Sequence, residues 1–431
     1  MSQFGDSTKC LHAGQSKDPA TNARAVPIYQ SSSFMFDSTE KAADLFALRE
    51  FGNVYTRLMN PTSSVWEQRI AAMEGGVAAL ATASGMSAIF LAVTTLVKNG
   101  DHIISSSSLY GGTDTLFRYV LPRFGIETTF LDELTEESLE AAVKDNTKII
   151  YGETIGNPKG DVLDFDAVSK VANKHGIPFM VDNTFAPLIC KPVEHGADIV
   201  VHSCTKWIGG HGTTIGGAIV DSGRFAWNNG RFPEFTEPDP SYHGMVYWDC
   251  FGDVPEMGNI AYIIKARVEG MRNVGPAPSP FNSFLILQGF ETLPLRMEKH
   301  CKNALELAGW LKQHELVEWV VFTGLEEHPG HGIAKKYFKG GFGSVLGFGP
   351  KGGFEAAQKF IDNCQLASHL ANVGDAKTLI LHPASTSHQQ LDEAAQKACG
   401  LSPDFVRVSV GIEDLKDIMA DFDQALKASQ S

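Results

Sequence analysis

The sequence predicts an α/β fold, with a large domain built on a mostly parallel sheet and a smaller C-terminal α+β domain. From about residue 61, short runs rich in Ile, Val and Phe alternate with amphipathic segments that end near glycine. This alternation indicates βαβ units, which build a parallel sheet with helices on both faces. From about residue 290 the pattern changes to a mixture of helices and strands.

The expected elements follow from these patterns. Strands are expected at DHIISSS (101–107), IETTFLD (126–132), TKIIYGE (147–153), IPFMVDN (177–183) and DIVVHS (198–203). Helices are expected between them, where apolar side chains recur at helical spacing, over 113–125, 136–143 and 164–176. The C-terminal part is expected to hold helices near 293–314 and 354–363, strands near 343–348 and 404–410, and a closing helix over 415–429.

Three regions are expected along the chain. Residues 1–60 lack sustained periodicity and are expected to form an arm that packs on another surface. Residues 61–290 form the large domain, interrupted by an insertion at about 222–280 that is rich in aromatic residues, Gly and Pro. Long insertions of this kind often lie beside active sites. Residues 291–431 form the smaller domain.

Composition excludes several classes of function. The net charge of −14 disfavours binding to nucleic acid or to an anionic membrane. No apolar stretch is long enough to span a membrane, and the first residues do not resemble a signal peptide. The seven scattered cysteines contain no C-x-x-C pair, which favours reduced thiols and a cytoplasmic protein over a disulfide framework or a zinc site.

Polar side chains gather where the predicted strands end. In open α/β sheets the ligand lies beyond the carboxyl ends of the strands. There the sequence places Asn157, Asp182, Ser203, Thr205 and Lys206, and the glycine turn TASGM before a helix that begins near Ser87.

This set suits an aldehyde cofactor that carries a phosphate. Gly85 would open a helix whose free N–H groups bind phosphate, with the hydroxyls of Ser203 and Thr205 beside it. Lys206 could form an imine, and Asp182 could hold a pyridine nitrogen protonated. Taken singly, such an aspartate is usually a turn former and such a lysine is usually solvated. Their joint placement favours a site.

At this point the chain resembles the Cys/Met-metabolism branch of the fold type I pyridoxal-phosphate enzymes. The resemblance runs through NVYTRLMNPT, ATASGMSAI, LYGGT, ETIGNP, VDNTFAP, VHSCTKWIGGHG, LHPASTSH and VRVSVGIED, in the family's order. It implies that pyridoxal 5'-phosphate is the cofactor and that Lys206, Asp182 and Tyr110 are catalytic.

The resemblance also implies the binding residues. Lys206 would carry the cofactor, Asp182 would pair with its ring nitrogen, Tyr110 would stack on the ring and Asn157 would contact the ring's phenolic oxygen. The phosphate would be held by Gly85, Met86, Ser203 and Thr205, and by Tyr55 and Arg57 of a neighbouring subunit. The substrate would be bound by Arg407, whose guanidinium suits a carboxylate, and by Asn372 and Tyr55. A homotetramer with active sites shared between subunits is expected.

Three features favour one reaction within the family. Gly112 stands where methionine γ-lyases have a cysteine, and Asp375 and Lys377 in NVGDAKTLILHPASTSH resemble the enzymes that sulfhydrylate O-acetylhomoserine. The insertion also fits those enzymes. The expected reaction is replacement of the acetoxy group of O-acetylhomoserine by sulfide or a thiol, giving homocysteine or methionine. Sulfide, methanethiol and a sulfur-carrier protein remain alternative donors. Cystathionine synthesis or lysis and methionine lysis remain alternative reactions, and acetyl, succinyl and phospho groups remain alternative leaving groups.

Other readings of the sequence are weaker. Residues 347–352 satisfy G-x-G-x-x-G but are more typical of a plain turn than of a dinucleotide site. Ser84 lacks the first glycine of a hydrolase elbow. No metal is expected, since His195, His202 and His211 lack ligand spacing; His211 is expected to line the site and the others to be structural. A non-catalytic protein that kept the fold would have lost Lys206 or Arg407, and both are present.

Overall fold

The computed structural model describes residues 3–157, 159–386 and 400–430. Its larger sheet has seven strands in the order β1-β7-β6-β5-β4-β2-β3. The neighbours β2, β3, β4, β5 and β6 are parallel, whereas β7 runs antiparallel to both β1 and β6. The expected mostly parallel sheet is therefore confirmed. The strands are β1 (Ala78–Thr82), β2 (His102–Ser106), β3 (Glu127–Leu131), β4 (Thr147–Glu153), β5 (Phe179–Asp182), β6 (Ile199–Ser203) and β7 (Gly217–Asp221).

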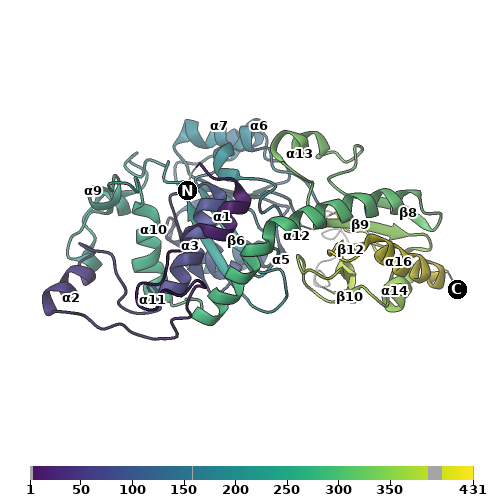
Figure 1. The fold of residues 1–431 in the computed structure, drawn as a ribbon. Coiled ribbons are helices and arrows are strands. Elements are labelled where there is room, and N and C mark those ends of the chain that lie inside the picture. Colours follow the sequence, from purple (N-terminus) through teal and green to yellow (C-terminus); the bar gives the residue numbers. More distant parts are fainter. Residues whose placement is uncertain (1–2, 158, 387–399, 431) are drawn as a thin grey trace.

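Helices cover both faces of this sheet because alternate side chains of its buried strands point to opposite sides. In β6, Val200 joins a core with α3 (Pro61–Glu74), α7 (Phe165–His175) and α12 (Pro280–Gln313). Its neighbours Ile199 and Val201 join the other core, with α4 (Gly85–Thr94) and parts of the insertion. The result is a three-layer domain whose central sheet is buried on both sides (Figure 1).

The connections and the insertion are made of short helices. The insertion packs its aromatic residues inward: Trp227 stacks on Phe235 and Tyr262, and all three are buried. It thus covers a face of the sheet. These segments are α5 (Gly111–Thr115), η1 (Leu116–Val120), η2 (Leu121–Phe124), α6 (Glu136–Ala142), η3 (Pro192–His195), α8 (Pro233–Thr236), η4 (Pro240–Tyr242), α9 (Tyr247–Phe251), α10 (Ala261–Lys265), η5 (Ala266–Met271) and α11 (Arg272–Val274).

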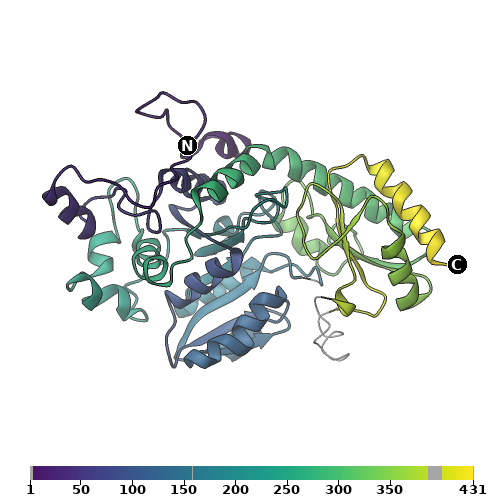
Figure 2. The same cartoon turned by 90° about the horizontal axis from the view of Figure 1, so that it is seen from below.

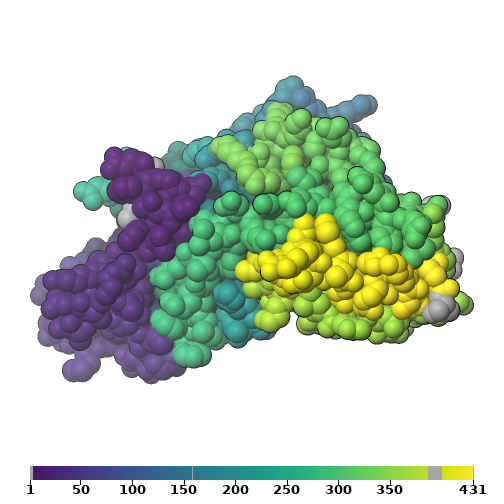
Figure 3. Space-filling view, turned by 45° about the vertical axis from the view of Figure 1, so that its right-hand side comes forward, coloured from purple at the N-terminus to yellow at the C-terminus, as the bar shows by residue number. Residues whose placement is uncertain are grey.

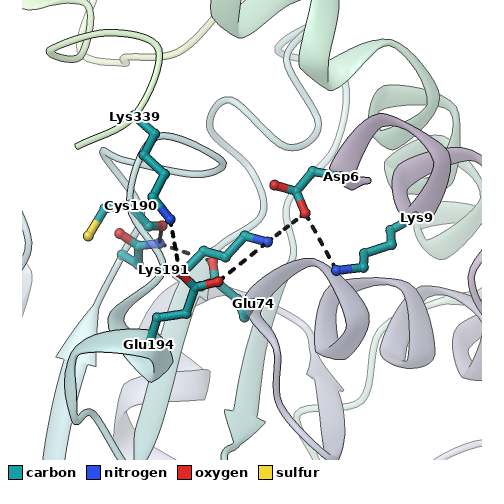
Figure 4. A network of polar contacts seen from close by, with 8 residues as sticks. Asp6, Lys9, Glu74, Cys190, Lys191, Glu194 and Lys339 are labelled. Atoms are coloured by element: carbon teal, nitrogen blue, oxygen red, sulfur yellow. Dashed lines mark hydrogen bonds and ion pairs between the residues drawn. The ribbon is translucent and has the colours of Figure 1, made fainter. Parts of the chain in front are cut away.

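The N-terminal segment, purple in Figure 3, contains two short helices, α1 (Asp6–His12) and α2 (Thr39–Phe46). In Figure 1, α2 lies at one end of the molecule, whereas α1 lies beside α3 and α12. Charged contacts hold α1 on the large domain (Figure 4): Asp6 pairs with Lys9 and, at 2.5 Å, with Lys191 in the segment after β5. The buried Arg69 of α3 donates to the carbonyls of Leu11 and Ala13. These contacts fix α1 but leave much of the segment from 28 to 57 exposed.

A second, smaller sheet forms the other end of the molecule. Its order is β10-β11-β12-β9-β8, with only the β10–β11 pair parallel. The helices α12, α14 and α16 pack on it, and Figure 2 shows α12 crossing from the large sheet to the small one. These elements are β8 (Val317–Val321), α13 (His331–Tyr337), β9 (Val345–Pro350), α14 (Gly353–Asn363), β10 (Ser368–His369), β11 (Leu379–Leu381), η6 (Pro383–Ser385), β12 (Val406–Ser409) and α16 (Leu415–Ser429).

The structure corrects the expected start of one long helix. The helix expected near 293–314 begins at Pro280 instead. The expectation was wrong because proline is typical of a first helical turn, whereas Pro294 lies inside this helix. It therefore crosses the boundary expected near residue 290, and the division at 60 and 290 stays a prediction. Among the helices of the described residues, none combines the length and apolar character that a bilayer span needs.

The edge of the large sheet opposite the carboxyl ends of its parallel strands carries two buried carboxyls. Burial raises the pKa of Asp198 and of Asp221 to about 7, and hydrogen bonds from Phe179 N and Gly223 N oppose this rise. Because each folded pKa lies above the ordinary value of 3.8, the stability that these groups contribute is full below pH 4 and falls as the pH rises toward 7.

The substitution Asp221→Asn is expected to remove part of the stability loss that occurs as the pH rises. Relative to the parent protein the variant should gain about 1–3 kcal/mol of unfolding free energy between pH 5 and pH 8, because its amide cannot ionise. Thermal unfolding at several pH values measures the difference. The surface variant Asp362→Asn is the control, and a stability difference for Asp221→Asn that does not grow with pH would contradict the assignment.

Candidate active site

A cavity of about 340 Å³ opens at the carboxyl ends of the parallel strands and reaches the small sheet. The structure brings together ten of the side chains and glycines expected at the site, although they come from seven separate stretches of sequence. The ten are Gly85, Met86, Tyr110, Asn157, Asp182, Ser203, Thr205, Lys206, Asn372 and Arg407.

One end of the cavity is suited to a phosphate. Ser84 caps α4 by accepting a hydrogen bond from the amide of Ser87, and the amides of Gly85 and Met86 have no partner within the helix. Gly85 lies so close to Ser203 that a Cβ atom at position 85 would be 2.6 Å from the Ser203 Cβ. The close approach leaves amide N–H groups and a hydroxyl facing the same space, as an anion at a helix N-terminus requires.

Asp182 provides a hydrogen-bond acceptor, in contrast to the donors at the phosphate end of the cavity. It is 9% exposed, and its Oδ1 accepts a hydrogen bond from the amide of Thr184 at 2.8 Å. Among the described residues it forms no ion pair. Burial raises the pKa of this carboxyl, and the Thr184 hydrogen bonds oppose the rise. A buried acceptor without a cation fits a protonated ring nitrogen, which would supply the missing charge.

Cationic groups lie on the side of the cavity nearer the small sheet. Lys206 follows β6, and its Nζ donates to Asn372 Oδ1 at 2.5 Å. Arg407 lies on β12 and makes only long hydrogen bonds, at 3.5 Å to Asn157 Oδ1 and at 3.4 Å to the carbonyl of Asn372. Its guanidinium is therefore free to bind a carboxylate in a bidentate manner.

Burial changes the acidity of both cations. Burial and, to a smaller extent, the nearby charge of Arg407 together lower the pKa of Lys206 to about 8. Burial lowers the pKa of Arg407 to about 10, which leaves the guanidinium charged at neutral pH. Near neutral pH about one Lys206 amine in ten is uncharged, so the residue can act as a nucleophile or a base.

One face of α12 holds the backbone on both sides of this cavity. Its buried Arg296 donates to the carbonyls of Trp207 and Ile208, at 2.6 and 3.1 Å, directly after Lys206. One turn later His300 Nδ1 donates to the carbonyl of Val410 at 2.7 Å, and Asn303 donates to the carbonyl of Gly411 at 3.0 Å. The same helix thus anchors the segment after Lys206 and the segment after the strand of Arg407.

Three expected residues do not line the cavity of this chain. Tyr55 is 42% exposed, and the Arg57 guanidinium lies 5.3 Å from its ring centroid on the N-terminal segment. Their predicted place in a neighbouring subunit's site stays a prediction. His211 is exposed rather than site-lining, which corrects that expectation. The other two histidines are structural: His195 packs on Phe165 and His202 bonds to Glu74.

Several residues that line the cavity are not predicted from the sequence. Glu153 ends β4 and accepts a hydrogen bond from the amide of Tyr110 at 2.7 Å. The Thr184 hydroxyl accepts from the amide of Ser203, which ties the segment after β5 to the end of β6. Phe185 lines the cavity and packs edge-on against Trp207. All three follow or end a predicted strand, and this position was the available signal.

The residues present fit pyridoxal phosphate, with a phosphate end at α4, a carboxyl without an ion pair at Asp182 and an amine of lowered pKa at Lys206. Within the parts of the chain that the structure describes, no cluster of three or more His, Cys, Asp or Glu side chains could hold a metal ion. The last two residues of LHPASTSH, and Pro158 of ETIGNP, lie outside the described residues.

Comparison with known proteins agrees with this geometry. Residues 7–427 match the family model for Cys/Met metabolism PLP-dependent enzymes. An O-acetyl-L-homoserine sulfhydrylase of Leptospira meyeri is 55% identical over 98% of this chain and 97% of that protein. A homocysteine synthase of Schizosaccharomyces pombe is 53% identical over 97% of each.

A solved structure extends the agreement to the fold. The crystal structure of a putative O-acetylhomoserine (thiol)-lyase from Campylobacter jejuni, which contains an N'-pyridoxyl-lysine-5'-monophosphate residue, superposes with a TM-score of 0.94 at 38% identity, covering 98% of this chain and all of that one. With its family match over nearly the whole length, the chain belongs to the Cys/Met metabolism family of pyridoxal-phosphate-dependent enzymes.

Proposed function

We propose that the protein converts O-acetyl-L-homoserine and sulfide into L-homocysteine and acetate, a step in the biosynthesis of methionine and cysteine. The convergence of Lys206, Asp182 and Arg407 on one cavity is the observation that carries this proposal. The sulfhydrylases among the relatives support the choice of reaction. Pyridoxal phosphate, when bound, supplies an aldehyde that condenses with amines and a ring that withdraws electrons from the substrate.

The chain's own residues hold the reactants. Arg407 binds the substrate carboxylate with its two Nη atoms, and Asn372 contacts it from the segment beside β11. Asp182 keeps the proton on the ring nitrogen, and the helix end at Gly85 and Met86 binds the phosphate. Fixing the substrate at several points orients the Cα–H bond for cleavage.

Lys206 moves the protons. As a neutral amine of lowered pKa it would take the proton from Cα, give that proton to the bound cofactor, and then take one from Cβ, so that acetate could leave from Cγ. Sulfide adds at Cγ, and Lys206 returns the protons. Arg407 thus contributes twice, by binding the carboxylate and by lowering the Lys206 pKa.

The environment of Gly112 favours this reaction over methionine lysis. A Cβ atom at position 112 would lie 2.6 Å from Tyr110 Cε1 and 3.1 Å from Met86 Sδ. The cysteine that methionine γ-lyases carry there would therefore displace the Tyr110 ring as it is now placed. The present position of the Tyr110 ring therefore favours glycine at position 112.

We infer an oligomer with shared sites. Tyr55 and Arg57 lie on an exposed segment outside the cavity of their own chain. We therefore expect them to bind the cofactor phosphate of a neighbouring subunit, so that two subunits form a dimer with shared sites and two dimers form a homotetramer. Sulfide is the proposed donor, with a thiol or a sulfur-carrier protein as alternatives, and the scattered free thiols favour the cytoplasm.

The first prediction tests the reaction. Purified protein with O-acetylhomoserine and sulfide should release acetate and homocysteine, and Lys206→Ala should lower the rate by about 1,000-fold or more. The surface variant Lys416→Ala should leave it unchanged. Abundant 2-oxobutyrate from methionine or cystathionine would instead indicate a lyase.

The second prediction concerns the charge of Arg407. In Arg407→Met the pKa of Lys206 should rise from about 8 toward 10.5, because a positive neighbour is lost. The pH dependence of reductive methylation at Lys206, followed by mass spectrometry in cofactor-free protein, measures this shift. Lys377→Met is the control, and an unmoved profile would disprove the coupling.

The third prediction concerns the space above the cofactor. Gly112→Ala should push the Tyr110 ring aside and weaken cofactor binding by about 2- to 10-fold, the contribution expected of one aromatic stacking contact. Gly111→Ala is a matched control, since a Cβ atom there meets nothing within 4 Å. Equal cofactor dissociation rates in the two variants would refute this role of Gly112.

A further inference from the structure

A second buried carboxyl faces the cavity beside Asp182. Glu153 ends β4 and Asp182 ends β5, and the two residues are paired in the register of these parallel strands. Glu153 is 8% exposed, and both side chains line the cavity. Adjacent parallel strands carry paired side chains on the same face, so the two carboxyls share one small buried region.

The contact that Glu153 makes is to the backbone of the stacking residue. Its Oε1 accepts a hydrogen bond from the Tyr110 amide at 2.7 Å. Tyr110 precedes α5, and its side chain makes no capping hydrogen bond to that helix. The Tyr110 ring is 49% exposed. Glu153 thus holds the Tyr110 amide, while the Tyr110 carbonyl accepts hydrogen bonds from the amides of Thr113 and Asp114.

The local charges do not favour a second carboxylate. Among the described residues neither Glu153 nor Asp182 forms an ion pair, and a bound cofactor would offer a single cationic ring nitrogen. Burial raises the pKa of Glu153 well above its usual value, and the charges of Asp182 and Asp161 raise it further, while the Tyr110 amide opposes them.

The other groups around Glu153 leave this balance in place. Tyr151, on the same strand, is itself buried, and its own pKa is raised by burial and by both carboxyls. The cations Lys206 and Arg407 line the same cavity but bond to Asn372 and Asn157. Neither of them bonds to Glu153.

We propose that Glu153 is a positioning residue that works as an uncharged carboxylic acid, holding the Tyr110 backbone in place while leaving Asp182 as the only negative charge at the ring nitrogen. The inference rests on the proposed function, because it assigns the ring nitrogen to Asp182 and the ring face to Tyr110. A neutral acid accepts the Tyr110 N–H through its carbonyl oxygen as well as an ionised one would. Asp182 can then ionise without a neighbouring charge of the same sign.

Two variants separate the charge of Glu153 from its hydrogen bond. Glu153→Gln keeps the accepting oxygen and is always neutral, and Glu153→Leu has similar size but no acceptor. The holoenzyme of Glu153→Gln should retain pyridoxal phosphate within about 3-fold of the parent, with the same pH dependence of the visible absorption band. Glu153→Leu should bind it about 10-fold more weakly, because the partly buried Tyr110 N–H loses its hydrogen-bond partner.

A direct measurement of the proton does not depend on activity. The infrared difference spectrum of the parent holoenzyme minus Glu153→Gln at neutral pH should show the carbonyl band of a protonated carboxyl. This subtraction removes the other buried carboxyls, and it remains readable if Glu153→Leu does not fold.

Two results would overturn the inference. One is a carboxylate band in place of the protonated band. The other is a Glu153→Gln enzyme whose cofactor affinity or absorption profile changes as much as that of Glu153→Leu. The assay with O-acetylhomoserine and sulfide is run in parallel. A parent enzyme that holds the cofactor but makes no homocysteine disproves the proposed reaction alone, since the infrared and binding results still decide the state of Glu153.

Discussion

The geometry of the site depends on the hydrogen bonds that α12 makes to backbone on both of its sides. The buried Arg296 donates hydrogen bonds to carbonyl groups of the segment after Lys206 and to the carbonyl of Gly289 in its own helix. His300 and Asn303, on the same face, hold the segment that leaves β12. Because a helix has a fixed rise per residue, this face sets the separation between the amine and the guanidinium.

The strand order supplies the other half of the site. Parallel strands that end at one edge place Glu153, Asp182 and Ser203 side by side, and α4 begins at the same edge. The acidic groups therefore come from the middle of the large sheet, whereas Arg407 comes from the small sheet. An acidic protein of net charge −14 can thus attract an amino-acid carboxylate at one point while holding a cationic ring nitrogen at another.

Regular, buried elements were the most predictable part of the fold. The strand predicted over 147–153 and the helix predicted over 415–429 agree with β4 and α16 at both ends, because their apolar spacing is unambiguous. β7 was not predicted because glycines on both sides of its short apolar run indicate a turn. The start of α12 was misplaced because a proline in a sequence marks a first turn more often than a helix interior.

At the site, too, the residues with a local sequence signal could be predicted and the others could not. Lys206, Asp182 and the glycine turn at Gly85 carry local signals, since each follows a strand at the ligand edge. Asn372 and Arg407 were reached through the family resemblance, because no local pattern tells that residue 372 meets Lys206 across 166 positions. Glu153 ended a correctly predicted strand, but its contact with Tyr110 depends on a loop 43 residues away.

The unbroken course of α12 has a consequence for how this polypeptide can be divided. A cut near residue 290, where the sequence alone suggests a domain boundary, would pass through α12, which packs on both sheets. Neither half is therefore expected to keep its share of the catalytic geometry when it is expressed alone. Gain or loss of one residue between 296 and 303 would turn the rest of that face by about 100° and separate the amine from the guanidinium. Length variation in this lineage should therefore collect in the surface loops, and α12 should keep a constant residue count.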